Sequence, residues 1–322
     1  MEEKIREYFS REGAEYFDDI VLMRKLGTVA NIKAIGCMYA DLAEHATENL
    51  LTSHDLILRV MEITDYFKQT RGKLSCSIST AMDIMIKGLA NYNEKSLKET
   101  IDFLTRAYPQ YELISNSWLE KIKQFSFHII KNVNSVLLYD YSSTVASILE
   151  IAAANGKILE VYIPCSGVLY GGRQFVIDAV KYGHKPFFFQ DVAMCDFIKR
   201  ADLALIGAES IYPDGGASNS IGSDIVAALC KIYGTPLYVV SSMLKYDSSY
   251  ITGSVKKRGF WDLRERMPVD LPQNVRNVTD FKSMNLIQIN ADSITAFITE
   301  IGVIPPNAMF HVGRNYLNHW KE

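Results

Sequence analysis

The sequence predicts an α/β protein in which a helical N-terminal domain precedes a doubly wound, Rossmann-like parallel sheet domain. Two observations lead to this prediction. Up to residue 132, apolar residues recur three and four positions apart, which is typical of amphipathic helices. From residue 133 to residue 322, short apolar runs alternate with segments of helical periodicity, as in parallel sheets that are covered on both faces. We therefore place the domain boundary between residues 132 and 133.

The helical domain is predicted to contain about six helices, separated by residues that break helices. Gly27, the Arg71-Gly72 pair and Pro109 lie between the periodic segments, where a glycine or a proline ends a helix. No segment of this domain has the pattern of a strand. The predicted helices cover residues 2–17, 31–49, 54–69, 77–92, 94–106 and 117–131.

The second domain is predicted to contain five parallel strands joined by helices. The strands cover residues 135–139, 159–163, 186–189, 203–207 and 236–240, and the helices between them cover residues 142–154, 174–182, 192–200 and 223–233. In sheets of this kind, ligands bind at the carboxyl ends of the strands, because the connecting loops gather there. The candidate functional residues are therefore those that directly follow each strand.

Composition and charge narrow the classes of partner. The net charge of −3 gives no general attraction to nucleic acids or anionic membranes, and the apolar runs are too short to cross a bilayer. The five cysteines are scattered without a C-x-x-C pair, so neither a disulfide framework nor a zinc site is indicated. No G-x-G-x-x-G motif follows a strand, which argues against a dinucleotide. We expect a cytoplasmic protein with no metal, no cofactor, no nucleic-acid partner and no membrane association.

The loop at residues 207–223 combines an acidic residue with glycines and serines. Glu209 directly follows the fourth strand, and Asn219 and Ser220 precede a helix that is predicted to begin near Gly222. Backbone N–H groups at a helix N-terminus form a natural seat for a phosphate. The alternative interpretation is a structural loop, because these residue types also make ordinary turns and caps.

The loop after the first strand begins with Asp140 and continues through Ser142 and Ser143 into a helix. The two hydroxyls either cap this helix or hold an anion at its positive end. If the two strand ends are neighbours, Asp140 and Glu209 form a carboxylate pair suited to acid–base catalysis. The alternative is that Asp140 only caps the helix. Lys245, after the fifth strand, is a candidate phosphate-binding cation.

Taken in order, these segments resemble the translation initiation factor 2B alpha/beta/delta superfamily, which includes methylthioribose-1-phosphate isomerase and ribose-1,5-bisphosphate isomerase. The similar segments are residues 141–145 (Y-S-S-T-V), 207–209 (G-A-E), 219–222 (N-S-I-G) and 293–303 (S-I-T-A-F-I-T-E-I-G-V). The resemblance covers about half of the chain and implies a nucleotide-fold-like domain, a phosphorylated small-molecule ligand and a homodimer.

The resemblance also assigns roles to individual positions. The isomerases of the family use a Cys and an Asp to convert an aldose 1-phosphate into a ketose 1-phosphate, and the matching positions here are Asp140 and Glu209. The lysine of the family's N-K pair is replaced by Ser220. The arginine-bearing loop of the family reads C-S-G-V at residues 165–168, with Arg173 a few residues on. Each lost cation removes about 1.5–3 kcal/mol of charge-assisted phosphate binding.

Two functions are expected from these residues, and a structural scaffold with an empty pocket is the third alternative. The first is a protein that binds a phosphorylated sugar or nucleotide and isomerises an aldose to a ketose with an altered acid–base pair. The second is a non-catalytic regulatory or assembly subunit that resembles initiation factor 2B alpha. The predicted catalytic residues are Asp140 and Glu209. The predicted ligand-binding residues are Arg71, Ser142, Ser143, Arg173, Asn219, Ser220 and Lys245.

Overall fold

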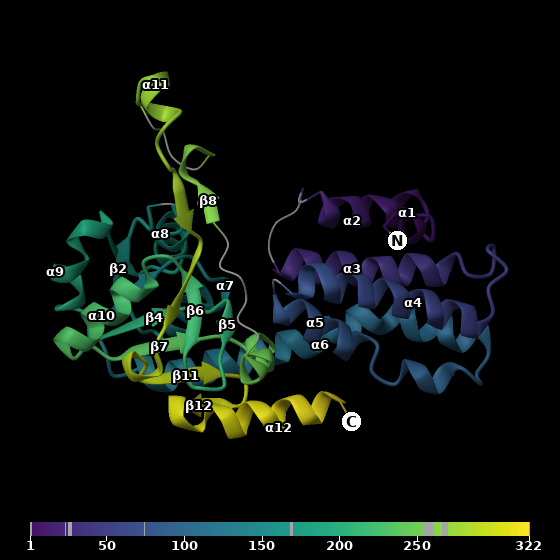
Figure 1. The fold of residues 1–322 in the computed structure, drawn as a ribbon. Coiled ribbons are helices and arrows are strands. Elements are labelled where there is room, and N and C mark those ends of the chain that lie inside the picture. The colour runs from purple at the N-terminus through teal and green to yellow at the C-terminus, as the bar shows by residue number, and fades with distance from the viewer. Residues whose placement is uncertain are drawn as a thin grey trace. The chain divides into compact units, whose positions relative to one another are not determined.

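A computed structural model of the chain describes residues 2–22, 24, 28–73, 75–167, 170–253, 260–265 and 270–321 (Figure 1). The helix break predicted at Gly27, and Val168 in the loop after the second predicted strand, lie outside these residues. The chain divides into two compact units. The first contains Met1–Ser117 and Asn315–Glu322, and the second contains Trp118–Arg314.

The N-terminal part of the chain is helical, as predicted, and its described residues contain no strand. Helix α4 continues directly into a π-helical turn at Lys68–Gly72, and a short 3-10 helix follows α5 at Leu89–Tyr92. The helices are α1 (Glu2–Arg6), α2 (Arg11–Val21), α3 (Thr28–Glu44), α4 (Ser53–Phe67), α5 (Cys76–Met85) and α6 (Leu97–Ile130).

Helix α6 corrects the prediction that Pro109 ends a helix. The helix runs through Pro109 without a break over 34 residues. A proline removes one backbone hydrogen bond from a helix and crowds the preceding turn. Here a continuous apolar stripe on both sides of the proline keeps the helix intact, because packing outweighs the local cost. The buried residues of that stripe include Leu104, Ala107, Tyr111, Trp118 and Ile122.

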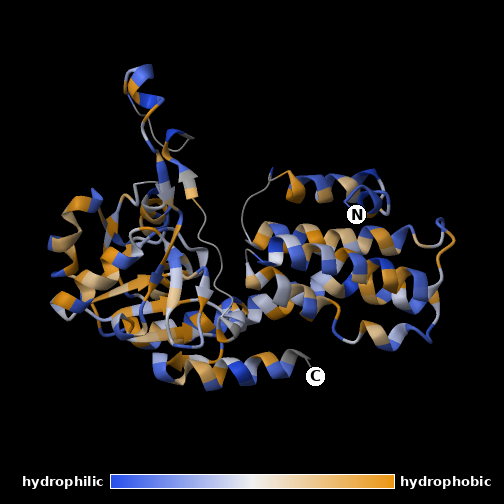
Figure 2. Cartoon of the chain, in the orientation of Figure 1, coloured by the Kyte–Doolittle hydropathy of each residue, from blue (hydrophilic) through white to orange (hydrophobic). Residues whose placement is uncertain are grey.

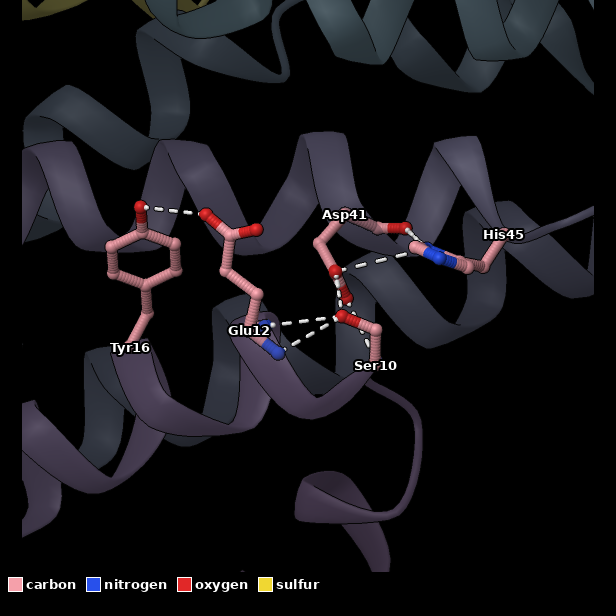
Figure 3. Close-up of polar contacts among 6 residues, drawn as sticks. Ser10, Glu12, Tyr16, Asp41 and His45 are labelled. Carbon is pink, nitrogen blue, oxygen red and sulfur yellow. Dashed lines mark hydrogen bonds and ion pairs between the residues drawn. The ribbon is translucent and has the colours of Figure 1, made fainter.

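A polar cluster joins α2 to α3 (Figure 3). Ser10 is the N-cap of α2: its hydroxyl accepts from the backbone N–H groups of Glu12 and Gly13 and donates to the carboxylate of Asp41 on α3. The backbone N–H of Ser10 donates to the same carboxylate at 3.0 Å. His45 lies on the far side of Asp41, whereas a catalytic triad needs the histidine between the serine and the acid. The cluster is therefore a structural joint and not a catalytic triad.

Replacing Asp41 by alanine is expected to destabilise the first unit by about 1–3 kcal/mol, because the N–H and hydroxyl of Ser10 lose their common acceptor in a largely buried position. Urea unfolding followed by circular dichroism measures the change. Asp65, an exposed acid on α4, supplies the control, and Asp65→Ala is expected to change the free energy of unfolding by less than about 0.5 kcal/mol. Equal stability of the two variants would contradict the assigned role of Asp41.

The second unit contains a seven-stranded sheet in the order β12-β11-β7-β4-β1-β2-β3. All of its neighbouring strands are parallel except β12, which is antiparallel to β11. The sheet is thus mainly parallel, as predicted, with one antiparallel edge. The strands are β1 (Ser135–Tyr139), β2 (Glu160–Pro164), β3 (Lys185–Phe189), β4 (Leu203–Ile206), β7 (Leu237–Val240), β11 (Ala296–Thr299) and β12 (Gly302–Ile304).

The strand order makes this sheet doubly wound. The chain moves outward from β1 to β2 and β3 in one direction, and then from β4 to β7 and β11 in the other. Because parallel crossovers are right-handed, the helices of the two halves cover opposite faces. Figure 2 shows the strands between these layers mostly in the orange of hydrophobic residues. The helices are α7 (Ser143–Ala154), α8 (Gly172–Lys181), α9 (Met194–Ile198), α10 (Ser223–Tyr233), α11 (Gln273–Arg276) and α12 (Met309–Lys321).

Residues 207–223, which were expected to form a long polar loop, contain two strands. Strands β5 (Ser210–Ile211) and β6 (Ala217–Ser220) form an antiparallel hairpin, and β10 (Leu286–Ile289) pairs with the other edge of β6. The prediction failed here because β6 reads Ala-Ser-Asn-Ser, a sequence without the apolar pattern of a strand. A separate two-stranded sheet joins β8 (Phe260–Asp262) to β9 (Lys282–Met284).

Within the described residues, no helix has both the length and the apolar character that a membrane crossing needs.

Candidate functional site

The candidate site lies where the direction of the sheet reverses. Strands β1 and β4 are parallel neighbours, with Tyr139 opposite Ile206 at their carboxyl ends. The two predicted acids, Asp140 and Glu209, therefore follow adjacent strands, which was the condition for pairing them. This reversal point is where open α/β sheets bind ligands, because the loops of the two halves part there. The carboxylates of Asp140 and Glu209 make no hydrogen bond to each other in the described part of the chain.

Asp140 is held in an uncommon conformation. Its φ of +52° lies in the left-handed region, and its backbone N–H donates to the hydroxyl of Ser166 at 3.2 Å. Burial raises the pKa of the Asp140 carboxyl above its usual value, and hydrogen bonds from the Ser220 side chain and the Tyr141 backbone oppose part of this shift. The structure thus brings together two predicted site residues, Asp140 and Ser220. A carboxyl with a raised pKa is suited to proton transfer near neutral pH.

Three helix N-termini meet around the end of β1. Ser142 caps α7, with its hydroxyl accepting from the backbone N–H of Val145 at 3.4 Å. The N-cap residues of α8 and α10 are Gly171 and Gly222, and neither helix receives a side-chain cap. Uncapped helix N-termini present free backbone N–H groups and a positive dipole end, which attract anions. The helix start predicted near Gly222 is confirmed.

The two N-cap glycines allow the starts of α8 and α10 to approach the end of β1 closely. A Cβ atom at Gly171 would lie 2.8 Å from the carboxylate oxygen Oδ1 of Asp140. At Gly222, where φ is +96°, a Cβ atom would lie 1.9 Å from the hydroxyl of Tyr139, which donates to the carbonyl of Ile221 at 2.9 Å. Only glycine lets these helix ends pack so tightly against the end of β1.

Backbone strain is concentrated at the same place. Four non-glycine residues of the described chain have a positive φ, and three of them, Asp140, Ser166 and Tyr170, follow strands β1 and β2. The fourth is Leu50, in the first unit. A left-handed conformation costs a non-glycine residue about 1–2 kcal/mol, and such residues gather at functional sites, where the surrounding contacts hold them.

Asp191 is a further residue of the site, at one of the strand ends that the sequence singled out but with no individual role predicted for it. It follows β3, and its two carboxylate oxygens accept from the backbone N–H groups of Ser166 at 2.9 Å and Gly167 at 2.7 Å. Ser166 in turn accepts from the backbone of Asp140. Asp191 therefore holds the loop after β2 against the end of β1. Its position directly after a strand was the only sequence signal that pointed to it.

The β4 side of the site contains Glu209 and Lys245. The backbone N–H of Glu209 donates to the carbonyl of Ser218 at 2.7 Å, which fixes the acid at the base of the β5–β6 hairpin. The ammonium of Lys245 donates to the carbonyl of Ala208, one residue before Glu209. The structure thus places the predicted cation on the backbone of the residue that precedes the predicted acid. An ammonium has three N–H donors, so this contact leaves Lys245 able to bind an anion as well.

Glu300 supports this side of the site and also had no individual role predicted for it. It is 3% exposed, and its carboxylate accepts from the backbone N–H of Met243 at 3.0 and 3.2 Å. This contact orders the short helix Met243–Lys245, which carries the ammonium. The glutamate within residues 293–303, which carried part of the family resemblance, therefore has a structural role in presenting Lys245.

The remaining predicted residues occupy different surroundings. The amide of Asn219 donates to the hydroxyl of Ser223 at 3.0 Å, inside the start of α10. Ser143 is exposed in the first turn of α7. Arg173 is also exposed, and the Cζ atom of its guanidinium lies 4.7 Å from the centre of the Tyr170 ring. Arg71 belongs to the first unit, where its guanidinium donates to the carbonyls of Ile20 and Val21 at the end of α2. In the described residues, no group of three His, Cys, Asp or Glu side chains could hold a metal ion.

Comparisons with known proteins agree on one family. The profile of the Initiation factor 2 subunit family (IF-2B) matches residues 30–306. Ribose 1,5-bisphosphate isomerase of Methanocaldococcus jannaschii is 26% identical over 250 residues, which cover 76% of this chain and 77% of that protein. Translation initiation factor eIF2B subunit alpha of Dictyostelium discoideum is 22% identical over 262 residues, which cover 77% of this chain and 81% of that protein.

Solved structures share the fold along most of the chain. The crystal structure of 5-methylthioribose 1-phosphate isomerase from Pyrococcus horikoshii superposes with a TM-score of 0.74, covering 96% of this chain and 88% of that one at 17% identity. The crystal structure of the delta subunit of translation initiation factor eIF-2B from A. fulgidus superposes with a TM-score of 0.70. The match covers 95% of this chain and 91% of that one at 19% identity. These likenesses confirm the predicted helical part followed by a mainly parallel sheet.

Proposed function

Since the chain belongs to the Initiation factor 2 subunit family, we propose that its α/β unit binds a phosphorylated sugar at the carboxyl ends of β1, β4 and β7. We further propose that Asp140 and Glu209 act there as an acid–base pair that interconverts an aldose and a ketose. The observation that carries the proposal is the environment of Asp140, a strained and half-buried acid with a raised pKa among three helix N-termini.

The two carboxyl groups suffice for the chemistry. One carboxylate removes the proton on C2 of the aldose while the other carboxyl group protonates the carbonyl oxygen O1, which gives an enediol. The O2 hydroxyl then loses its proton, and C1 receives one, so that the product is the ketose. All protons and electrons stay within the substrate and the acid–base pair. The raised pKa of Asp140 suits it to carry a proton in one step and release it in the next.

The phosphate of the ligand has a separate place in this proposal. The ammonium of Lys245 lies on the β4 side, bound to the carbonyl of Ala208. The N-terminus of α10 adds a positive dipole end and the backbone N–H groups of its first turn, while the N–H of the N-cap residue Gly222 donates to Asp224. A single cation and one helix end are modest phosphate contacts, so we expect an affinity in the micromolar range and not in the nanomolar range.

A second candidate function is a non-catalytic subunit that binds the same class of ligand. The observation that favours it is Asp140 itself, because the resemblance implies a cysteine at this position in the isomerases. The similarity to eIF2B subunit alpha of Dictyostelium discoideum is in line with such a role. In that case the ligand is bound and released unchanged, and the site acts as a sensor.

Thermal unfolding with a panel of sugar phosphates tests ligand binding. A ligand at 100 times its dissociation constant stabilises the folded protein by about 2.7 kcal/mol, which raises the melting temperature of a chain of this size by several degrees. The same sugars without phosphate, and inorganic phosphate alone, are the controls. Lys245→Ala is expected to weaken the effect, whereas Lys231→Ala, which removes a cation paired with Asp292 on the surface, should not. No shift with any phosphorylated compound would contradict both candidate functions.

The stabilising compound then separates the two functions. Proton NMR of the compound incubated with the protein detects the conversion of an aldose into a ketose. Conversion supports the isomerase, and binding without any conversion supports the non-catalytic subunit.

A further inference from the structure

Residues 260–265 and 270–284 form an arm that leaves the α/β unit. Strands β8 and β9 make its two-stranded ribbon, and α11 lies at its outer end (Figure 1). Within the described part of the chain, β8 and β9 pair only with each other. A two-stranded ribbon by itself is at best marginally stable in water, and a helix of four residues needs packing against other elements. The arm therefore needs a surface that covers it.

The arm is anchored at one end. Strand β9 leads directly into Asn285, whose carbonyl accepts from the backbone N–H of Ile221 at 3.1 Å, and β10 then pairs with β6. These backbone hydrogen bonds fix the base of the arm on the α/β unit. From this base the arm projects outward and does not fold back over the sheet (Figure 1).

The arm exposes apolar side chains that its own ribbon does not cover. Phe281 is 9% exposed, and the Cζ atom of Arg264 lies 5.2 Å from the centre of its ring, so the ribbon has a small interior of its own. Other apolar side chains of the arm lie outside this interior, and apolar residues gathered on one exposed element indicate a protein contact. They are Phe260 (61% exposed), Leu271 (40%), Val275 (38%) and Val278 (85%).

The charge of this part of the chain differs from that of the remainder. Residues 256–284 carry seven basic and four acidic side chains, a net charge of +3. The rest of the chain carries 27 basic and 33 acidic side chains, a net charge of −6. Opposite net charges favour the encounter of two surfaces and oppose the contact of two arms with each other. The chemistry that suits the arm is thus that of the remainder of this same chain.

We propose that the arm docks on a second copy of this chain, in a symmetric dimer in which each copy covers the arm of the other. Identical chains most commonly associate about a two-fold axis, where the same surfaces meet twice. The apolar side chains of the arm become buried in this contact, and the basic arm lies against the acidic remainder of the partner. This is the surface through which the homodimer expected from the sequence forms.

Sedimentation velocity at micromolar concentrations tests the proposal on three full-length proteins. The wild type is expected to be a dimer. The double variant Phe260→Asp, Val278→Asp places two charges in the contact and is expected to weaken the dimer by at least about 100-fold, which leaves a monomer. Both side chains are exposed in the single chain, so the fold of the α/β unit does not depend on them. Thermal unfolding verifies that each protein is folded.

The matched control is the double variant Leu50→Asp, Val192→Asp. These two side chains are 90% and 89% exposed and lie outside the arm, so this variant should remain a dimer. Hydrogen exchange is the second measurement: the amides of β8 and β9 should be protected in the wild type and the control, and should exchange faster in the arm variant.

Three results would overturn the inference: a monomeric wild type, an arm variant that dimerises as tightly as the wild type, or a control that dissociates as readily as the arm variant. None of these measurements involves a sugar phosphate. Their outcome is therefore independent of whether the proposed function is correct.

Discussion

Replacing Asp140 by asparagine is expected to lower the turnover of the aldose phosphate by about 10²- to 10⁴-fold, the usual contribution of a positioned acid or base. The amide has nearly the same shape as the carboxyl group but can neither accept nor return the substrate proton. Glu209→Gln is expected to have an effect of similar size, because the enediol route needs both groups. Initial rates measured by the appearance of the ketose give the comparison, with Asp196→Asn, which neutralises an exposed acid on α9, as the control.

The loss is expected without a loss of stability. Burial raises the pKa of Asp140 in the folded state, so its contribution to stability is fully present below the unfolded pKa and is lost as the pH rises through the folded pKa. Once it is ionised, the carboxylate is therefore a cost to the folded protein. Asp140→Asn removes that charge and should melt at the same temperature as the wild type or higher. A variant that keeps wild-type turnover would rule out the acid–base role of Asp140.

Replacing Gly313 by alanine is expected to destabilise the second unit by about 2–3 kcal/mol, although alanine normally favours a helix over glycine. Gly313 lies within α12, and a Cβ atom at this position would be 2.1 Å from the ring of Tyr246. Tyr246 is 2% exposed and bridges to Ile211 of β5, so its ring has little room to move. The displacement would also shift the adjacent Lys245 and weaken ligand binding.

Chemical denaturation and sugar-phosphate affinity, measured on the same variant, test this expectation. Asn315→Ala serves as the control, because Asn315 is exposed on the same helix, where alanine should be neutral or slightly stabilising. If Gly313→Ala proves as stable as the control, this result contradicts the claim that α12 packs too closely on Tyr246 to admit a Cβ atom at residue 313.

Much of the fold could be predicted because burial and pattern agree in its central parts. The strand predicted at residues 135–139 and the helix predicted at residues 223–233 coincide with β1 and α10. Both are apolar where they pack and end at residues that suit a turn or a cap. The position of the site followed from the same pattern, since the loops at the carboxyl ends of parallel strands gather at one edge of the sheet.

Other features depend on contacts between distant residues. The polar hairpin of β5 and β6 forms because β10, some 70 residues along the chain, pairs with its edge. Helix α6 crosses Pro109 because its apolar stripe is buried on both sides. The clamp that Asp191 places on Ser166 requires β3 to lie beside β2, and a lone acid after a strand does not reveal that partner.

The left-handed residues of the site have a consequence for laboratory evolution. Ser166 and Tyr170 keep their positive φ within a set of contacts: the hydroxyl of Ser166 accepts from the backbone N–H of Asp140, and the backbone N–H of Tyr170 donates to the carbonyl of Ser166. Glycine at either position would release conformational strain of about 1 kcal/mol and let the loop sample more shapes. Selection for heat resistance alone would therefore accept changes in this loop early. Selection for ligand recognition would reject the same changes, so the two screens should diverge first at these positions.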